Sequence, residues 1–219
     1  MVKKILTENQ IKILEKISND KFITDNFYLT GGTALAEFYL KHRFSEDLDF
    51  FSEQEFDTET ISVFFQKNKI ALKIKLVDFE QSYNRNLFFL HIDNEIIKTE
   101  FTYFPFPRIE KLKKFKNISI DSAHDIAVNK IFTIYQKERA RDYIDLYFLI
   151  KKYKWSVEEL IKKAKIKFDW HIDYLQLGTQ FTKAENVSDY SKMIKNVSKK
   201  DWINFFIKEA NKLKGKIIE

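Results

Sequence analysis

The spacing of apolar residues predicts that the first part of the chain contains both strands and helices. A helix that starts with a capping box is expected over 7–19, and a second helix over 58–67. Residues 22–25 are expected only to lead into the first strand, and residues 93 and 94 to form a hairpin turn before the last one. The strands are expected at 27–30, around Asp47 and Asp49, and at 71–77, 86–92 and 96–104.

After Pro107 the apolar spacing becomes helical. Pro105 and Pro107 are the only prolines, and we expect them to close the sheet region because proline cannot donate to a strand ladder. The pattern predicts an α+β protein with an α/β domain over residues 1–107 and a helical domain over 108–219. The later helices are expected at about 121–137, 138–150, 155–167, 170–177, 188–197 and 199–214.

The composition narrows the class of protein. The chain of 219 residues has 22 Phe and 10 Tyr but only 4 Gly and 2 Pro, which indicates short loops and a large aromatic core. The absence of cysteine excludes disulfides and thiolate metal sites. There is no run of about 18 apolar residues and the N-terminus is polar, so we expect no membrane span, no signal peptide and a cytoplasmic location. The net charge of +6 suits an RNA or DNA partner, although an AT-rich genome would give the same Lys-rich composition.

Gly31 and Gly32 stand between a predicted strand and a predicted helix. Glycine adopts backbone angles closed to other residues, so the amides that open this helix at Thr33 can point at an anion such as phosphate. Asp47 and Asp49 are two residues apart, which on a strand places both side chains on one face, about 6.7 Å apart along the chain. At that distance they repel by roughly 2.5 kcal/mol at an effective dielectric of about 20, and a divalent cation turns the repulsion into attraction. The stretch therefore predicts a site for a nucleotide and a metal ion, with Mg²⁺ favoured.

Lys130 lies inside the apolar stripe of the 121–137 helix, where another apolar residue is expected. A buried lysine is costly unless an anion compensates its charge. Lys130 either points across a domain cleft at nucleotide phosphates, or has a snorkelling stem or a structural ion pair. Arg43, in the loop before the aspartates, either clamps a triphosphate through two hydrogen bonds or lies on the surface.

These residues resemble a known family. A Gly-Gly at a helix start followed by an Asp-x-Asp strand is similar to the signature of the polymerase-β-like minimal nucleotidyltransferases. The resemblance to their AbiEii/AbiGii branch, the toxins of bacterial type IV toxin–antitoxin systems, rests on a longer string: Gly-Gly-Thr-Ala-Leu-Ala at 31–36 and His-Arg-Phe-Ser-Glu-Asp-Leu-Asp-Phe-Phe at 42–51. The second half of that signature is matched by Asn129-Lys130 and by Arg-Asp-x-x-Asp-Leu at 141–146. The resemblance covers about residues 26 to 150.

The resemblance implies a mixed sheet flanked by helices, followed by a helical domain that contributes Lys130 and Asp142 to the active-site cleft. Gly31, Gly32 and Thr33 would hold the triphosphate, and Asp47 and Asp49 would carry Mg²⁺, or Mn²⁺ in its place. Lys130 would neutralise phosphate charge in the transition state.

Three further carboxylates have assignments that rest on the same resemblance. Glu100 would be a third metal ligand or the base for the attacking hydroxyl; its alternative is an ordinary solvent-facing strand position. Asp142 is implied as the catalytic-site carboxylate and Asp145 as its structural partner, whereas the alternative is local pairing with Arg139 or Arg141. Asp125 belongs to the motif or serves the first turn of its helix.

The implied reaction transfers a nucleoside monophosphate from an NTP to an RNA acceptor, the 3′ end of tRNA, with a co-encoded antitoxin, a role in phage defence and no membrane partner. One alternative keeps this chemistry and changes the acceptor to an antibiotic or a protein hydroxyl. Another is an inactive binding protein. Zinc chemistry is not expected, because the four histidines lack ligand spacing, and the chain has no Walker loop and no Gly-x-Ser-x-Gly elbow.

Overall fold

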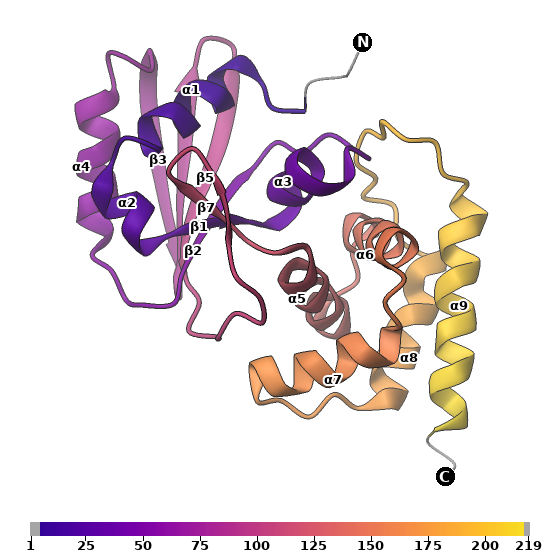
Figure 1. Ribbon diagram of the computed structural model, residues 1–219. Coiled ribbons are helices and arrows are strands. Elements are labelled where there is room, and N and C mark those ends of the chain that lie inside the picture. The colour runs from indigo at the N-terminus through magenta and orange to yellow at the C-terminus, as the bar shows by residue number, and fades with distance from the viewer. Residues whose placement is uncertain (1–4, 217–219) are drawn as a thin grey trace. The chain divides into compact units, whose positions relative to one another are not determined.

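The computed structural model describes residues 5–216 and divides the chain into two compact units (Figure 1). The first, here called the sheet unit, comprises the chain up to residue 39 together with 44–107 and 111–122. The second, the helical unit, comprises 40–43, 108–110 and the chain from 123 onward. Neither unit is therefore a single continuous stretch of chain.

Within the described residues, the sheet unit contains one seven-stranded sheet in the order β3-β4-β5-β2-β1-β7-β6. β1 pairs parallel with β7 and β2 parallel with β5, whereas the other neighbours are antiparallel. The predicted α+β fold with a mixed sheet is confirmed. The sheet does not close at Pro107 as expected, because two short strands after the prolines extend it. The strands are β1 (Tyr28–Thr30), β2 (Leu48–Ser52), β3 (Ile74–Ser82), β4 (Arg85–Ile92), β5 (Glu95–Tyr103), β6 (Lys113–Phe115) and β7 (Ile118–Ile120).

The helices of the sheet unit follow the predicted order with one addition. The capping box of the first helix is present, with Thr7 and Gln10 bonding to each other's backbone amides. Residues 22–25 are helical rather than a plain lead-in, because Asp20 caps this short helix by accepting the amide of Ile23. The helices are α1 (Glu8–Ile17), α2 (Lys21–Asn26), α3 (Gly31–Leu35), which runs on as a π-helical turn over Ala36–Leu40, and α4 (Thr58–Asn68).

Phenylalanine rings fill the core of the sheet unit. Phe101 of β5 is fully buried, and its ring centroid lies 5.1 to 6.2 Å from those of Phe27, Phe50, Phe65 and Phe88. Phe65 comes from α4, so this helix covers the sheet face that bears Phe50 and Phe101. Side chains alternate along a strand, so the neighbouring residues of β2 and β5 point to the opposite face.

The helical unit contains α5 (Ala123–Gln136), α6 (Ala140–Tyr153), α7 (Val157–Phe168), α8 (Tyr174–Thr182) and α9 (Lys199–Gly215). The segment 188–197, expected to be helical, is a loop. The amides of Ile194 and Lys195 donate to the carbonyl of His42, and Met193 forms a β-bridge with Arg43, so this loop is held by partners far away in sequence. Among the described helices, none is both long and apolar enough to cross a membrane.

Replacing Phe101 with alanine should lower the free energy of unfolding by about 3–5 kcal/mol, because it leaves a cavity among the surrounding rings. The matched variant Tyr83→Ala, at a residue 98% exposed, should change it by less than about 0.5 kcal/mol. Urea unfolding followed by circular dichroism measures both variants. Equal stabilities would contradict the core assigned to Phe101.

Candidate active site

The start of β2 places carboxylates on one face of the sheet. Asp49 lies opposite Glu100 of β5 and, on its other side, opposite Thr30 of β1. Asp47 immediately precedes β2 and is half-buried like Asp49, whereas Leu48 between them is fully buried. Because side chains alternate in extended chain, Asp47, Asp49 and Glu100 share the face opposite the aromatic core.

Two cationic side chains balance part of this negative charge. Lys98 Nζ lies 2.8 Å from Asp47 Oδ2, and Arg85 donates to both oxygens of Glu100 at 2.8 and 2.7 Å. Burial alone would raise the pKa of the Glu100 carboxyl, but the hydrogen bonds from Arg85 and Thr102 outweigh it and hold the pKa below its usual value. Glu100 is therefore ionised. It is only 4% exposed, so the alternative of an ordinary solvent-facing strand glutamate is wrong.

Gly31 sets the start of α3 directly against Asp49. Its φ of +71° lies in the left-handed region, and a Cβ at this position would overlap the Asp49 carboxylate. The turn therefore requires glycine both for its conformation and for the close approach. Thr33 is fully buried, and its hydroxyl donates to the carbonyl of Asp47, so this side chain joins α3 to the aspartate segment. The predicted phosphate contacts would thus fall to the backbone amides of residues 31–33.

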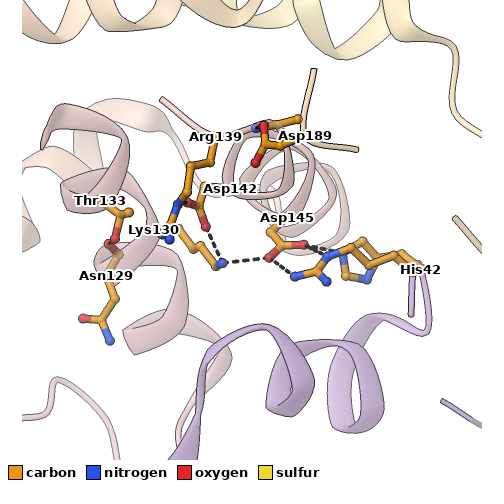
Figure 2. A network of polar contacts seen from close by, with 10 residues as sticks. His42, Asn129, Lys130, Thr133, Arg139, Asp142, Asp145 and Asp189 are labelled. Atoms are coloured by element: carbon orange, nitrogen blue, oxygen red, sulfur yellow. Dashed lines mark hydrogen bonds and ion pairs between the residues drawn. The ribbon is translucent and has the colours of Figure 1, made fainter. Parts of the chain in front are cut away.

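A second set of predicted residues forms a buried ion network in the helical unit (Figure 2). Lys130 of α5 is 9% exposed, and its Nζ lies 2.5 Å from Asp142 Oδ1 and 2.9 Å from Asp145 Oδ2, both on α6. Burial would lower the pKa of the Lys130 ammonium, but the two carboxylates outweigh it and raise the pKa above its usual value. The structural ion pair that the sequence left open as an alternative is therefore present.

Both aspartates of this network are fully buried, and each has further donors. Arg139 Nε donates to Asp142 Oδ2 at 2.6 Å. Arg43 donates to Asp145 through Nε and Nη2 at 2.6 and 2.8 Å, and His42 Nε2 lies 2.7 Å from the same carboxylate (Figure 2). Burial would raise the pKa of Asp145, yet Lys130 and Arg43 hold it well below its usual range.

These contacts bear on two of the predicted site residues. Arg43 is 3% exposed, so the alternative of a surface loop arginine is wrong. Its bidentate contact is made to Asp145, and the triphosphate clamp stays a prediction. Asp142 accepts from Lys130 and Arg139, which places it where it orients the lysine.

Asp125 forms a separate buried cluster in the helical unit. It accepts the amides of Ile109 and Glu110, and it pairs with Lys167 Nζ at 2.8 Å. The burial of Lys167 was not predicted from the sequence. The signal was present, because Lys167 lies seven residues after Leu160 and three after Ala164 on the buried side of α7. The same helical spacing singled out Lys130.

His42 was also missed as part of the network. Its ring is fully buried, and Nδ1 has no hydrogen-bond partner. Burial lowers the pKa of the His42 imidazole, and Arg43 and Lys130 lower it further, against the attraction of Asp145. The ring is therefore neutral, with Nε2–H donating to Asp145. A loop residue such as His42 has no periodic pattern that would indicate its burial. Its partner, Asp145, lies 103 residues later in the chain.

The predicted residues thus form two groups, each within one unit. Gly31, Thr33, Asp47, Asp49 and Glu100 lie together in the sheet unit. Arg43, Lys130 and Asp142 belong to the network of the helical unit. That both groups act on one substrate stays a prediction.

Protonation of His42 should destabilise the fold at mildly acidic pH. Because its folded pKa lies below the unfolded value of 6.5, the unfolded state binds more protons, and the free energy of unfolding falls as pH drops below that value. The slope is at most about 1.4 kcal/mol per pH unit for one group. His42→Gln keeps a donor toward Asp145 but cannot titrate, so denaturant unfolding between pH 7 and 5 should show a flatter dependence than in the unmodified protein. His171→Gln, at an exposed position, serves as control, and a parallel loss of stability in all three proteins would contradict the assignment.

Known structures share this fold. A candidate nucleotidyltransferase from Helicobacter pylori superposes with a TM-score of 0.63 at 18% identity, over 96% of this chain and 97% of that one. MenT4, a nucleotidyltransferase toxin from Mycobacterium tuberculosis H37Rv, superposes with a TM-score of 0.60 at 14% identity, over 94% of this chain and 84% of that one. At these identities the likeness shows the fold.

Sequence comparison goes further than the fold. An uncharacterized protein of Aquifex aeolicus is 34% identical over 165 residues, which are 74% of this chain and 76% of that protein. The family model of the nucleotidyl transferase AbiEii toxin of type IV toxin–antitoxin systems matches residues 12–211. That match spans both units and includes every residue of the two groups described above. The chain belongs to the AbiEii family of nucleotidyltransferase toxins.

Proposed function

We propose that the protein is a Mg²⁺-dependent enzyme that transfers a nucleoside monophosphate from an NTP to the 3′ end of an RNA, with tRNA as the acceptor. The observation that carries the proposal is the approach of Gly31 to Asp49, which sets the turn before α3 against a pair of aspartates. Phosphates bound at such a turn would lie beside carboxylates that can hold a divalent cation. This is the pairing that nucleotidyl transfer with release of pyrophosphate requires.

The donors of the sheet unit fit Mg²⁺. In residues 5–216, no group of three or more His, Cys, Asp or Glu side chains is arranged to hold a metal ion. Mg²⁺ does not need such a cage, because it is commonly held by one or two carboxylates and fills its other positions with water and substrate phosphates. Asp47 and Asp49 would hold it. When bound, the ion would offset the charge of the triphosphate and of the leaving pyrophosphate.

The protein's own groups have separate tasks in this proposal. The amides of residues 31–33 would bind the triphosphate without a side chain in the way. Glu100 is ionised and held by Arg85, so it would accept a hydrogen bond from the attacking hydroxyl and orient it. Lys130, fixed by its two aspartates, would balance charge that develops on the phosphates.

An RNA acceptor is supported by charge and by family. The net charge of +6 favours a polyanionic partner. Membership in a type IV toxin family supports an acceptor whose modification stops growth, restrained by a co-encoded antitoxin. Incubation of the purified protein with each labelled NTP, Mg²⁺ and total tRNA tests the reaction. Label on RNA supports the proposal, and label only on protein or on no acceptor contradicts it.

Asp49→Asn should reduce transfer at least about a hundredfold, because the amide removes a charge needed to hold the cation. Asp47→Asn should act in the same direction, and EDTA should abolish transfer by the unmodified protein. The matched control is Asp78→Asn on β3, which removes the same charge from a half-exposed carboxylate that pairs with His91. Equal activity of the Asp49 and Asp78 variants would contradict the proposed role of Asp49 in holding the cation.

Gly31→Ala should abolish transfer and lower stability, since a Cβ would overlap Asp49 and the backbone is left-handed. The control is Gly178→Ala, where a Cβ would lie 3.8 Å from the nearest atom, the Ala210 carbonyl oxygen. As a helical position it should tolerate the change and gain about 0.5–1 kcal/mol. Transfer assays and thermal unfolding of both variants check this contrast. A fully active Gly31→Ala enzyme would show that the close approach is not required.

A further inference from the structure

A hollow of about 580 Å³ opens on the helical unit between α6, the loop before α9 and the first turn of α9. On α6, Lys151 follows Tyr147 by four residues and Phe148 by three, so these side chains share one helix face. The other walls include polar side chains from the loop and from α9, namely Asn196, Ser198 and Asp201.

Two walls of this hollow are held by His42, a member of the buried ion network. The loop before α9 is held because the carbonyl of His42 accepts the amides of Ile194 and Lys195 at 2.8 and 2.9 Å. The ring of His42 also packs edge-on against Phe148, with 5.1 Å between the centroids. The hollow is therefore a built feature of the unit rather than an accident of loop placement.

The chemistry of the lining matches an unpaired nucleobase. Tyr147 and Phe148 are partly exposed aromatic rings, on which a base of any sequence can stack. The amide of Asn196, the hydroxyl of Ser198 and the carboxylate of Asp201 can bond the polar edge of a base. Lys151 lines the hollow, and exposed Lys195 and Lys199 adjoin Asn196 and Ser198 in the chain, so these lysines supply cations for the adjoining phosphates.

We propose that this hollow binds an unpaired base of the RNA acceptor, an inference that rests on the proposed function above. Single-stranded RNA is recognised in this way, by bases that stack on aromatic side chains and bond through their edges. The site is continuous with the predicted catalytic lysine, because Phe148 contacts His42, His42 bonds to Asp145, and Asp145 pairs with Lys130. Within the helical unit, the bound base would hold the RNA at a fixed place relative to Lys130.

The test compares Tyr147→Ala and Lys151→Ala with Lys152→Ala in the full-length protein. Lys152 is the next residue on α6 and is exposed. Its Nζ lies 5.3 Å from the centroid of the Tyr153 ring, as Lys151 Nζ lies 5.6 Å from that of Tyr147, so it repeats the lysine–aromatic pair outside the hollow. Fluorescence anisotropy with one RNA oligonucleotide, single-stranded or annealed to its complement, gives the Kd. Steady-state transfer to tRNA gives kcat and KM, and thermal unfolding confirms that the variants fold.

Tyr147→Ala should raise the Kd for single-stranded RNA and the KM for tRNA about tenfold, through lost stacking. Lys151→Ala should raise both severalfold and flatten the salt dependence of binding. The kcat at saturating tRNA, the KM for NTP, the affinity for the duplex and all properties of Lys152→Ala should stay unchanged.

The possible failures are distinguishable. If the unmodified protein transfers label to tRNA and the hollow variants behave like Lys152→Ala, the base site is wrong and the proposed function stands. An equal loss of affinity for single-stranded and duplex RNA also overturns the base site, because it indicates charge alone. If the unmodified protein transfers label to no RNA, the proposed function fails. In that case the single-stranded binding data decide the base site by themselves, and unchanged affinity in Tyr147→Ala overturns it.

Discussion

The helical unit depends on the contacts of one buried carboxylate, that of Asp145. It accepts from Arg43, His42 and Lys130, so one residue of α6 ties together the 40–43 segment and α5. A charge in this position is costly unless its partners stay in place, and removal of one partner leaves buried charge that is less well compensated. The arrangement therefore specifies one conformation for Lys130, whose ammonium has little freedom to move.

The two units treat their carboxylates differently. In the sheet unit, Asp47 and Asp49 are half-buried and lie near Lys98 and Arg85, whose side chains are partly exposed. In the helical unit, Asp142 and Asp145 are fully buried and enclosed by donors. Half-buried carboxylates can exchange a lysine for a metal ion at small cost, whereas enclosed ones cannot. The metal site that we propose therefore lies among the carboxylates of the sheet unit, whereas the carboxylates of the helical unit hold the ammonium of Lys130 in place.

The periodicity of apolar residues in the sequence predicted much of the fold and part of the candidate site, because periodicity indicates which residues are buried. The alternation around Asp47 and Asp49 indicated their shared face, and the apolar stripe of α5 marked Lys130 as a buried charge. Periodicity does not report the partner: the contacts of Arg43 and His42 with Asp145 join residues about a hundred positions apart. The strands β6 and β7 escaped prediction because each has only three residues and β6 is exposed throughout.

The route of the chain has a consequence for how this protein can be altered. The backbone passes between the two units after residues 39, 43, 107, 110 and 122. A fragment that begins at Ala123 would keep Lys130 and both aspartates but lose His42, Arg43 and the amides that satisfy Asp125. Its interior would carry surplus negative charge. The chain from residue 123 onward therefore cannot be transplanted on its own by recombination or protein engineering; the two short pieces 40–43 and 108–110 must go with it.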